Sequence, residues 1–458
     1  MRRSGWTKPT QCWLPNRSLR DTGSMATCIA TARPRSARLG KHGREDVKTQ
    51  AEQPTLNRTL SLAQATLYGL GVTIGAGIYV LIGAAAARSA MSAPIAFLVA
   101  AAVMSLTAAS FAELVGRVPV AAGEAAYARV AFNSDALATA VGLFVVCIAI
   151  VSASAISVGT AGYMSVFVGL PASVLVTIVV FAMGAVAAWG IKESVLFAGA
   201  LTLIETAGLV LIVVSGILFV PDLFSRFAEA LPSFAVPGTT SALLSTTLLA
   251  VFAFIGFESL ANVAEEVRDP AITLPKAIFL TLVISTILYM LVIWVALVAV
   301  PLPELINSSA PLALVFERVT GASPRIMSAI ALIATLNGIV VQIIMASRVL
   351  YGLGRQGQLP SIFGKVNARS RTPTLATAVT VALVLLFALV LPLHELADLA
   401  SRLTLLVFAM ANLSLAWIKR RGDPPPEHAW IVPSWVPWAG CMSCLALFVI
   451  ELSVGDGT

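Results

Sequence analysis

The sequence predicts an all-α integral membrane protein with about eleven transmembrane helices. Of its 458 residues, 58% are hydrophobic and only 12% are charged, whereas soluble domains carry about 25% charged residues. Apolar runs of about 18 residues or more recur between Ser61 and Leu452, each long enough to cross the roughly 30 Å hydrocarbon layer as a helix. Clusters of Pro, Gly and charged residues separate these runs and are expected to end the helices.

Eleven segments have the length and apolar character of a membrane span. Their predicted ranges are 61–87, 92–116, 136–164, 172–190, 196–220, 242–266, 274–300, 325–353, 374–392, 395–418 and 433–452. The segment 301–324 differs from them and predicts a short amphipathic helix, Pro311–Thr320, that lies at the membrane interface.

The net charge of +7 is concentrated in the amino-terminal tail. Residues 1–58 hold 12 of the 30 basic residues and only 4 of the 23 acidic residues. This tail has no apolar core of a secretory signal, and its composition predicts a disordered cytoplasmic extension; Met25 is an alternative start. A solvated extension is favoured over a nucleic-acid-binding arm, so no nucleic acid partner is expected.

Basic residues in the short loops orient the spans. With the amino terminus in the cytoplasm, 13 of the 18 Lys and Arg residues after the tail fall on the inner side. We therefore expect a multi-pass protein of the cell membrane with a cytoplasmic amino terminus. The sequence does not indicate an oligomeric state.

Cysteine and histidine give little sign of metal or redox chemistry. Cys441 and Cys444 have C-x-x-C spacing, but no second pair or partner histidine follows them, so small buried thiols are the favoured interpretation. No H-E-x-x-H motif is present among the three histidines. No metal site and no cofactor are expected.

Glycines interrupt two spans at mid-depth. Gly69–Ile78 lies within the first span and Val251–Ser259 within the sixth. The sixth span follows the first at an interval of five spans, and an odd interval places the second copy upside down relative to the first, as in an inverted repeat. Close helix packing could explain one such glycine cluster, but two at matched positions favour a binding site.

An unwound helix in the membrane must turn its backbone groups toward a cavity or a ligand. The half-helix that begins near Ala76–Ile78 presents free amides and a positive dipole end suited to a carboxylate. Carbonyl groups near Ile74 and Phe252–Ile255 could accept an ammonium, so the pair fits a zwitterionic amino acid. The predicted substrate-binding residues are Ile74, Gly75, Ala76, Gly77, Phe252, Ala253, Ile255, Gly256, Glu258 and Asn337.

Several motifs in one order resemble the amino acid permease branch of the amino acid-polyamine-organocation (APC) superfamily. They cover residues 60 to about 418 and comprise Thr73–Tyr79, Phe111–Leu114 with Arg117–Pro119, Phe252–Glu258, Ala264–Pro270 with Leu274–Lys276, Ser347–Pro360 and Thr372–Thr374. The resemblance implies a five-plus-five inverted-repeat fold like that of sodium-coupled leucine transporters. It places the substrate between the first, third, sixth and eighth helices.

The implied domains are a first five-helix repeat at 59–220, an inverted second repeat at 241–418 and an additional helix at 433–452. The family commonly has twelve spans, one more than expected here. The implied activity is secondary active transport of amino acids by alternating access, with proton-coupled symport as the first expectation. An amino acid or polyamine exchanger and a non-transporting amino acid sensor are the alternatives.

Three polar residues in the spans have open roles. Glu258 follows the sixth-span break, where a carboxylate could sense the ammonium or brace a gate, and the site role is favoured over a structural one. Asn337 lies near the middle of the eighth span and could line the site or bond another helix. Few other charges lie nearby, which favours a neutral substrate.

Glu205 departs from the resembled family. In its proton-coupled bacterial members the corresponding position, counted from Gly190–Ser194, is a lysine. A carboxyl group there could bind and release a proton during the cycle, or it could be neutral and structural. Glu205 is thus the candidate for coupling to H+, the expected driving ion.

Other classes of membrane protein fit less well. A channel should show polar rings or a filter loop, and an intramembrane enzyme needs a catalytic group set. Neither pattern is evident, so no enzymatic activity is expected.

Overall fold

The computed structural model describes residues 60–119, 123–189, 195–264, 266–367, 372–426 and 429–455. The predicted tail at 1–58 lies outside these residues. The described residues form mainly helices, which are α1 (Leu62–Ala76), α2 (Ile78–Ser89), α3 (Ala93–Arg117), α4 (Gly123–Phe132), α5 (Asp135–Met164), α6 (Ala172–Trp189), α7 (Val195–Phe219), α8 (Thr239–Phe254), α9 (Pro270–Ala299), α10 (Leu302–Asn307), α11 (Pro311–Thr320), α12 (Pro324–Arg355), α13 (Thr374–Val390), α14 (Leu393–Arg421) and α15 (Trp435–Gly455), with 3-10 helices η2 (Ala90–Ser92), η3 (Ser225–Ala230) and η4 (Phe257–Val263).

Local signals set several helix ends. Ser61 and Gln64 form a reciprocal capping box at the start of α1. Ser134 accepts a hydrogen bond from the backbone of α5. Gly321 and Gly422 adopt left-handed conformations with φ of 69° and 78° and end α11 and α14.

Among the described residues, eight helical segments are long and apolar enough to cross a membrane, and two shorter apolar helices accompany them. One of the eight, Ile78–Arg117, has 40 residues. A straight helix of that length would measure about 60 Å, twice the hydrocarbon thickness. The chain turns within it at Ala90, where φ is 45° and ψ is −126°, so α2 and α3 are separate helices as the ranges 61–87 and 92–116 predict.

The outer surface of the helices is apolar, as expected for a multi-pass membrane protein. Large apolar side chains are exposed on α6 and α7, including Phe181 at 56% and Leu218 at 68%. Such a surface would be unfavourable in water but suits contact with lipid.

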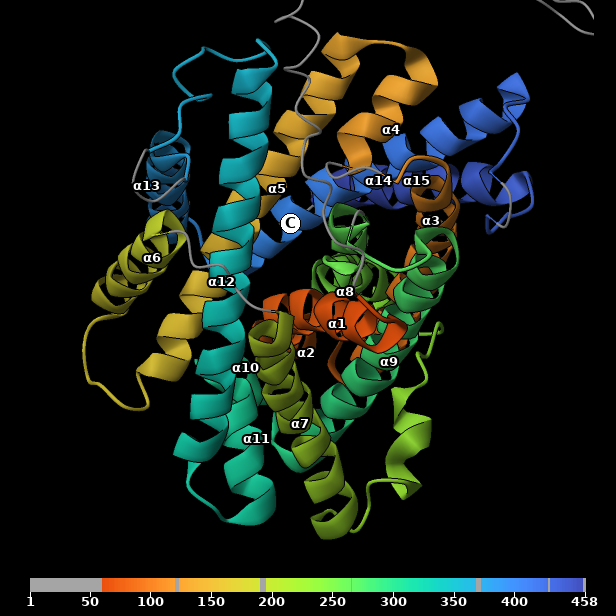
Figure 1. Cartoon of the computed structure of the whole chain (residues 1–458). Coiled ribbons are helices and arrows are strands. Elements are labelled where there is room, and N and C mark those ends of the chain that lie inside the picture. Colours follow the sequence, from red (N-terminus) through yellow and green to blue (C-terminus); the bar gives the residue numbers. More distant parts are fainter. Residues whose placement is uncertain are drawn as a thin grey trace, which may run out of the picture. The chain divides into compact units, whose positions relative to one another are not determined.

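The first helix runs through the middle of the packed helices. It contacts α7, α9 and α12 (Figure 1), while α12 and α5 pack along each other and α14 lies against α5. The helices α6 and α13 form a neighbouring pair, and α15 packs against α3 and α14. This arrangement surrounds the end of α1 with protein.

The predicted amphipathic segment is a helix with the expected bounds, Pro311–Thr320. Its buried side includes Leu312, Val315 and Phe316, and it packs against α7, α9 and α12. The helix therefore covers other helices of the molecule.

A short backbone pairing joins the start of α1 to the end of the sixth predicted span. Leu60 and Val267 form a parallel bridge. The Leu60 amide donates to the Glu266 carbonyl and the Arg268 amide donates to the Leu60 carbonyl, each at 3.0 Å. Two segments far apart in sequence are thus fixed together at one end of their helices.

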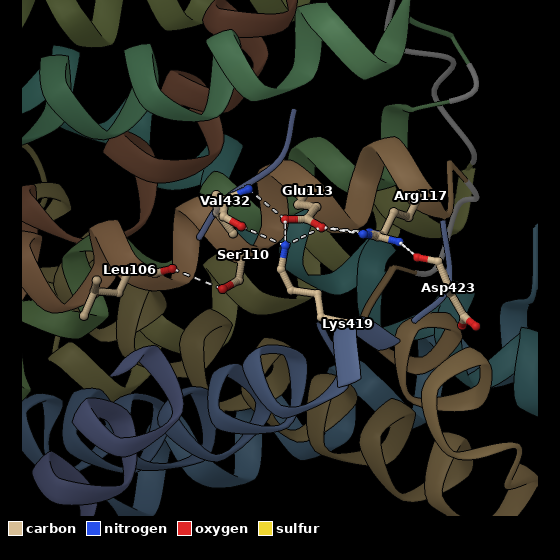
Figure 2. A network of polar contacts seen from close by, with 7 residues as sticks. All are labelled: Leu106, Ser110, Glu113, Arg117, Lys419, Asp423 and Val432. Carbon is tan, nitrogen blue, oxygen red and sulfur yellow. Dashed lines mark hydrogen bonds and ion pairs between the residues drawn. The ribbon is translucent and has the colours of Figure 1, made fainter. Parts of the chain in front are cut away.

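A buried ion cluster holds the segment before α15 (Figure 2). Glu113 on α3 is fully buried and accepts hydrogen bonds from Lys419 on α14 at 2.6 and 2.8 Å. Its carboxylate also accepts from the Arg117 side chain and from the Val432 amide. The cluster satisfies a charge that would otherwise be costly to bury, and it ties three segments together.

Candidate functional site

The first interruption lies at Gly77, two residues after the predicted Gly75. The α1 helix continues through Ile74 and Gly75 to Ala76, and α2 begins at Ile78. Gly77 has φ of −119° and ψ of −62°, and its carbonyl accepts hydrogen bonds from the second half-helix. The start of α2 at Ile78 agrees with the predicted half-helix start near Ala76–Ile78, whereas Gly75 itself stays within α1.

The second interruption lies at Ile255 and Gly256, as predicted. The α8 helix ends at Phe254, Ile255 is extended with ψ of 126°, and Gly256 has φ of 135°. Only glycine adopts that φ without strain. The chain then continues as the 3-10 helix η4.

The two interruptions lie against each other. A Cβ added at Gly77 would overlap the Cα of Ala253, and one added at Gly256 would lie 2.8 Å from the Thr73 amide nitrogen. Phe252 and Ile74 are fully buried beside them. The structure therefore brings together predicted residues from both breaks, in a closely packed arrangement.

Three tyrosines supply hydrogen bonds around the breaks. The Tyr289 hydroxyl donates to the Thr73 carbonyl at 3.0 Å, and the Tyr79 hydroxyl donates to the Glu205 carbonyl at 2.7 Å. The Tyr163 hydroxyl donates to the Tyr79 carbonyl. Each satisfies a backbone acceptor in an apolar interior, where an unpaired carbonyl is costly.

Glu205 and Asn337 interact directly. The Asn337 amide donates to Oε1 of Glu205 at 3.1 Å, which joins α12 to α7. Glu205 is fully buried, and its Oε2 has no hydrogen-bond partner among the described residues. A Cβ added at Gly75 would lie 3.5 Å from that oxygen. The carboxyl group therefore sits where α1, α7 and α12 meet, beside the first break.

Glu258 caps the second break. Both of its carboxylate oxygens accept hydrogen bonds from the Gly256 amide, at 2.8 and 3.0 Å. Its side chain lies among buried residues, with 8% of the residue exposed. The carboxylate thus braces the unwound segment in this conformation.

A large cavity of about 740 Å³ lies beside α2, α5 and the α10–α11 segment. Val80, Gly159 and Tyr163 line it, and Arg88 and His394 also contribute to its wall. The predicted residues at the two breaks do not line it. Arg88 pairs with Asp398 at 2.5 Å across this side of the molecule, joining α2 to α14.

Residues 60–455 match the family model for amino acid permeases. The chain belongs to this amino acid permease family. Permeases are transport proteins, so the chain is a membrane transporter and not an enzyme.

Individual permeases and transporters are similar along most of this chain. The branched-chain amino acid permease BcaP of Bacillus subtilis is 27% identical, covering 87% of this chain and 89% of the relative. The methylthioribose transporter of the same organism is 26% identical, covering 85% and 87%. The vacuolar cationic amino acid transporter 2 of Arabidopsis thaliana is 28% identical over 83% of this chain, which spans only 62% of that longer protein.

Sequence reasoning overlooked the tyrosines of this permease. Only six tyrosines occur in the chain, and Tyr79, Tyr163 and Tyr289 all lie in apolar helices with their hydroxyl groups bonded. A tyrosine hydroxyl buried in a membrane span needs a hydrogen-bond partner. The presence of tyrosines in apolar runs could therefore have marked these positions. The partners themselves depend on which helix faces meet.

Proposed function

We propose that this permease is a secondary active transporter that carries amino acids across the cell membrane by alternating access, as a proton-coupled symporter. The observation that carries the proposal is the contact between the two interruptions, Gly77 against Ala253 and Gly256 against Thr73. Separating two such breaks would expose backbone amides and carbonyls to a ligand at mid-depth.

The proposal includes the five-plus-five inverted-repeat architecture. The first repeat would cover 59–220 and the second 241–418, with the helix at 433–452 outside both repeats and eleven spans in all. The amino terminus would be cytoplasmic. Support comes from the interruptions in the first and sixth predicted spans and from the spacing between them.

The proposed substrate is a neutral amino acid. The names of the relatives cover branched-chain amino acids, cationic amino acids and methylthioribose, so family membership alone does not select among them. Apart from Glu205 and Glu258, the side chains around the breaks are mainly small or apolar, including Ala253 and Ile255. Such surroundings favour a substrate whose side chain carries no charge.

Glu205 is the proposed coupling residue. Its unpartnered oxygen beside Gly75 could hold a proton in one conformation and release it when α1 moves relative to α12. Glu205→Gln keeps a group that can accept from Asn337 but cannot ionise. We expect this variant to retain exchange of substrate and to lose accumulation driven by a pH gradient; unchanged gradient-driven accumulation would show that Glu205 is not the coupling group.

Uptake of labelled amino acids into proteoliposomes tests the whole proposal. Saturable, gradient-driven accumulation is expected for a symporter. Flux that requires substrate on both sides would identify an exchanger, and measurable binding without flux would identify a sensor. A panel of neutral and cationic amino acids in the same assay tests the substrate class.

A further inference from the structure

A second, much smaller cavity lies beside the segment that follows the sixth-span break. Its volume is about 20 Å³, and it is bounded by α4, α5, η4, α12 and α14. Its polar lining consists of Glu124, Glu258, Ser259, Asn262 and Thr404. A cavity of this size has room for about one water molecule.

Two carboxyl groups share this cavity. Glu124, near the start of α4, and Glu258, at the start of η4, are each 8% exposed. None of the described residues that line the cavity is basic. Two buried carboxylates without a cation repel each other, so such a pair retains a proton or binds a small cation.

Thr404 provides a separate indication that the cavity binds a polar ligand. Its residue is 1% exposed, and its hydroxyl has no hydrogen-bond partner among the described residues. Buried hydroxyl groups are ordinarily hydrogen-bonded to protein or to ordered water. Thr404 and both glutamates line the same cavity, so a water molecule held there is the available partner for this hydroxyl.

Other charged groups on the surrounding helices do not line the cavity. On α4, Arg129 pairs with Asp135 at 2.9 Å, and Tyr127 packs its ring against Phe111. On α14, Arg402 lies outside the lining; Asp398 pairs with Arg88, and Lys419 pairs with Glu113. Among the described residues, the titratable groups that line the cavity are thus the two glutamates.

We infer that this cavity is a proton-binding site in which Glu124 and Glu258 share one proton through a single water molecule that also bonds Thr404. The site is separate from Glu205, which lies at the contact of α1, α7 and α12. Its role in transport rests on the proposed proton coupling, whereas its existence does not.

The geometry connects the site to the break. The Glu258 carboxylate caps the Gly256 amide, so a proton gained or lost by the pair changes the charge at the unwound segment. Glu124 lies outside the spanning helices, and burial raises the pKa of its carboxyl group to about 7. Proton exchange at this site therefore falls near neutral pH.

Infrared difference spectroscopy of the purified full-length protein during a pH titration tests the inference. The wild type should show a protonated carboxyl band that disappears as the pH rises through about 7. Glu124→Gln should remove this band. Glu258→Gln should lower the Glu124 midpoint, because the carboxyl group that shares the proton is then replaced by an uncharged amide.

Glu229→Gln is the matched control, since Glu229 is an exposed residue in an ion pair with Arg226. This control should leave the band and its midpoint unchanged. An unaltered midpoint in Glu258→Gln would show that the two groups do not share a proton. A shift on replacing choline chloride with sodium chloride at constant ionic strength would assign the cavity to sodium and overturn the inference.

A second pair of variants tests the bridging water and leaves both carboxyl groups in place. Thr404→Val should raise the Glu124 midpoint, because the hydroxyl stabilises the ionised form through the water, and Thr404→Ser should restore it. Identical Glu124 midpoints in Thr404→Val and Thr404→Ser would exclude the bridging water. These spectra need no substrate or gradient, so a lack of uptake would refute the proposed function and leave this inference standing.

Discussion

At the residue scale, the glycines of the two breaks are required by backbone contact rather than by flexibility. Gly256 has φ of 135°, and its Cα faces the backbone of Val72 and Thr73. Gly77 has an ordinary negative φ but faces the Cα of Ala253. A side chain at either position would push the two interruptions apart.

Gly77→Ala should therefore destabilise the protein by about 1–3 kcal/mol, as expected for an overpacked interior, and it should reduce uptake. Gly352→Ala is the control, because that glycine lies in α12 with open space around its Cα. The control should be neutral or more stable by up to about 1 kcal/mol. Thermal unfolding in detergent measures both, and equal melting temperatures for the two variants would contradict the contact.

The sequence predicted many of the residues that lie around the two breaks but not their partners. Glycines within apolar runs predicted both breaks. Charged residues are rare in the predicted spans, so Glu205 and Glu258 stood out as candidates. The bond between Asn337 and Glu205 joins helices from different predicted halves, so it depends on helix faces that spacing does not define. The same holds for Glu124 and Thr404, which lie 280 positions apart and share one cavity.

At the element scale, the positions of the helices could be predicted from the lengths of the apolar runs and from the Pro and Gly residues between them. The predicted range 136–164 corresponds to α5 at Asp135–Met164, and 172–190 corresponds to α6 at Ala172–Trp189. The backbone geometry inside the two interrupted spans was harder to predict from the sequence. Gly75 stays within α1, and the break falls at Gly77, although both glycines are closely approached by other helices.

The ion cluster around Glu113 should determine how firmly the segment before α15 is held. Lys419→Met leaves a fully buried carboxylate with fewer partners, which is expected to cost about 3–5 kcal/mol. The double variant Glu113→Gln with Lys419→Met should lose less than the sum of the single changes, because neither charge is then left alone.

Thermal unfolding of the four proteins in this cycle provides the measurement. Glu229→Gln, in the exposed pair with Arg226, serves as the control and should leave the melting temperature unchanged. Strict additivity in the cycle would show that Glu113 and Lys419 do not stabilise each other.

At the scale of the whole molecule, the large cavity and the predicted orientation can be tested together. Ala87 is exposed and lines the 740 Å³ cavity, at the end of α2 expected to face outward. Lys365 is exposed in the segment between α12 and α13, which is expected to face the cytoplasm.

In a background with the five native cysteines replaced, Ala87→Cys should react with a membrane-impermeant thiol reagent in intact cells. Lys365→Cys should react only after the membrane is permeabilised. Labelling of both positions is measured by a mass shift on denaturing gels. The opposite pattern would invert the proposed topology without affecting the packing of the helices.

The pairing of Leu60 with Val267 has a mechanical consequence. Its two hydrogen bonds join Leu60, just before α1, to the segment that follows η4. The start of the first interrupted helix is therefore bonded to the segment that follows the second, so a movement of one is expected to move the other. A force applied to the chain immediately before Leu60 would be transmitted through these two hydrogen bonds toward Gly256.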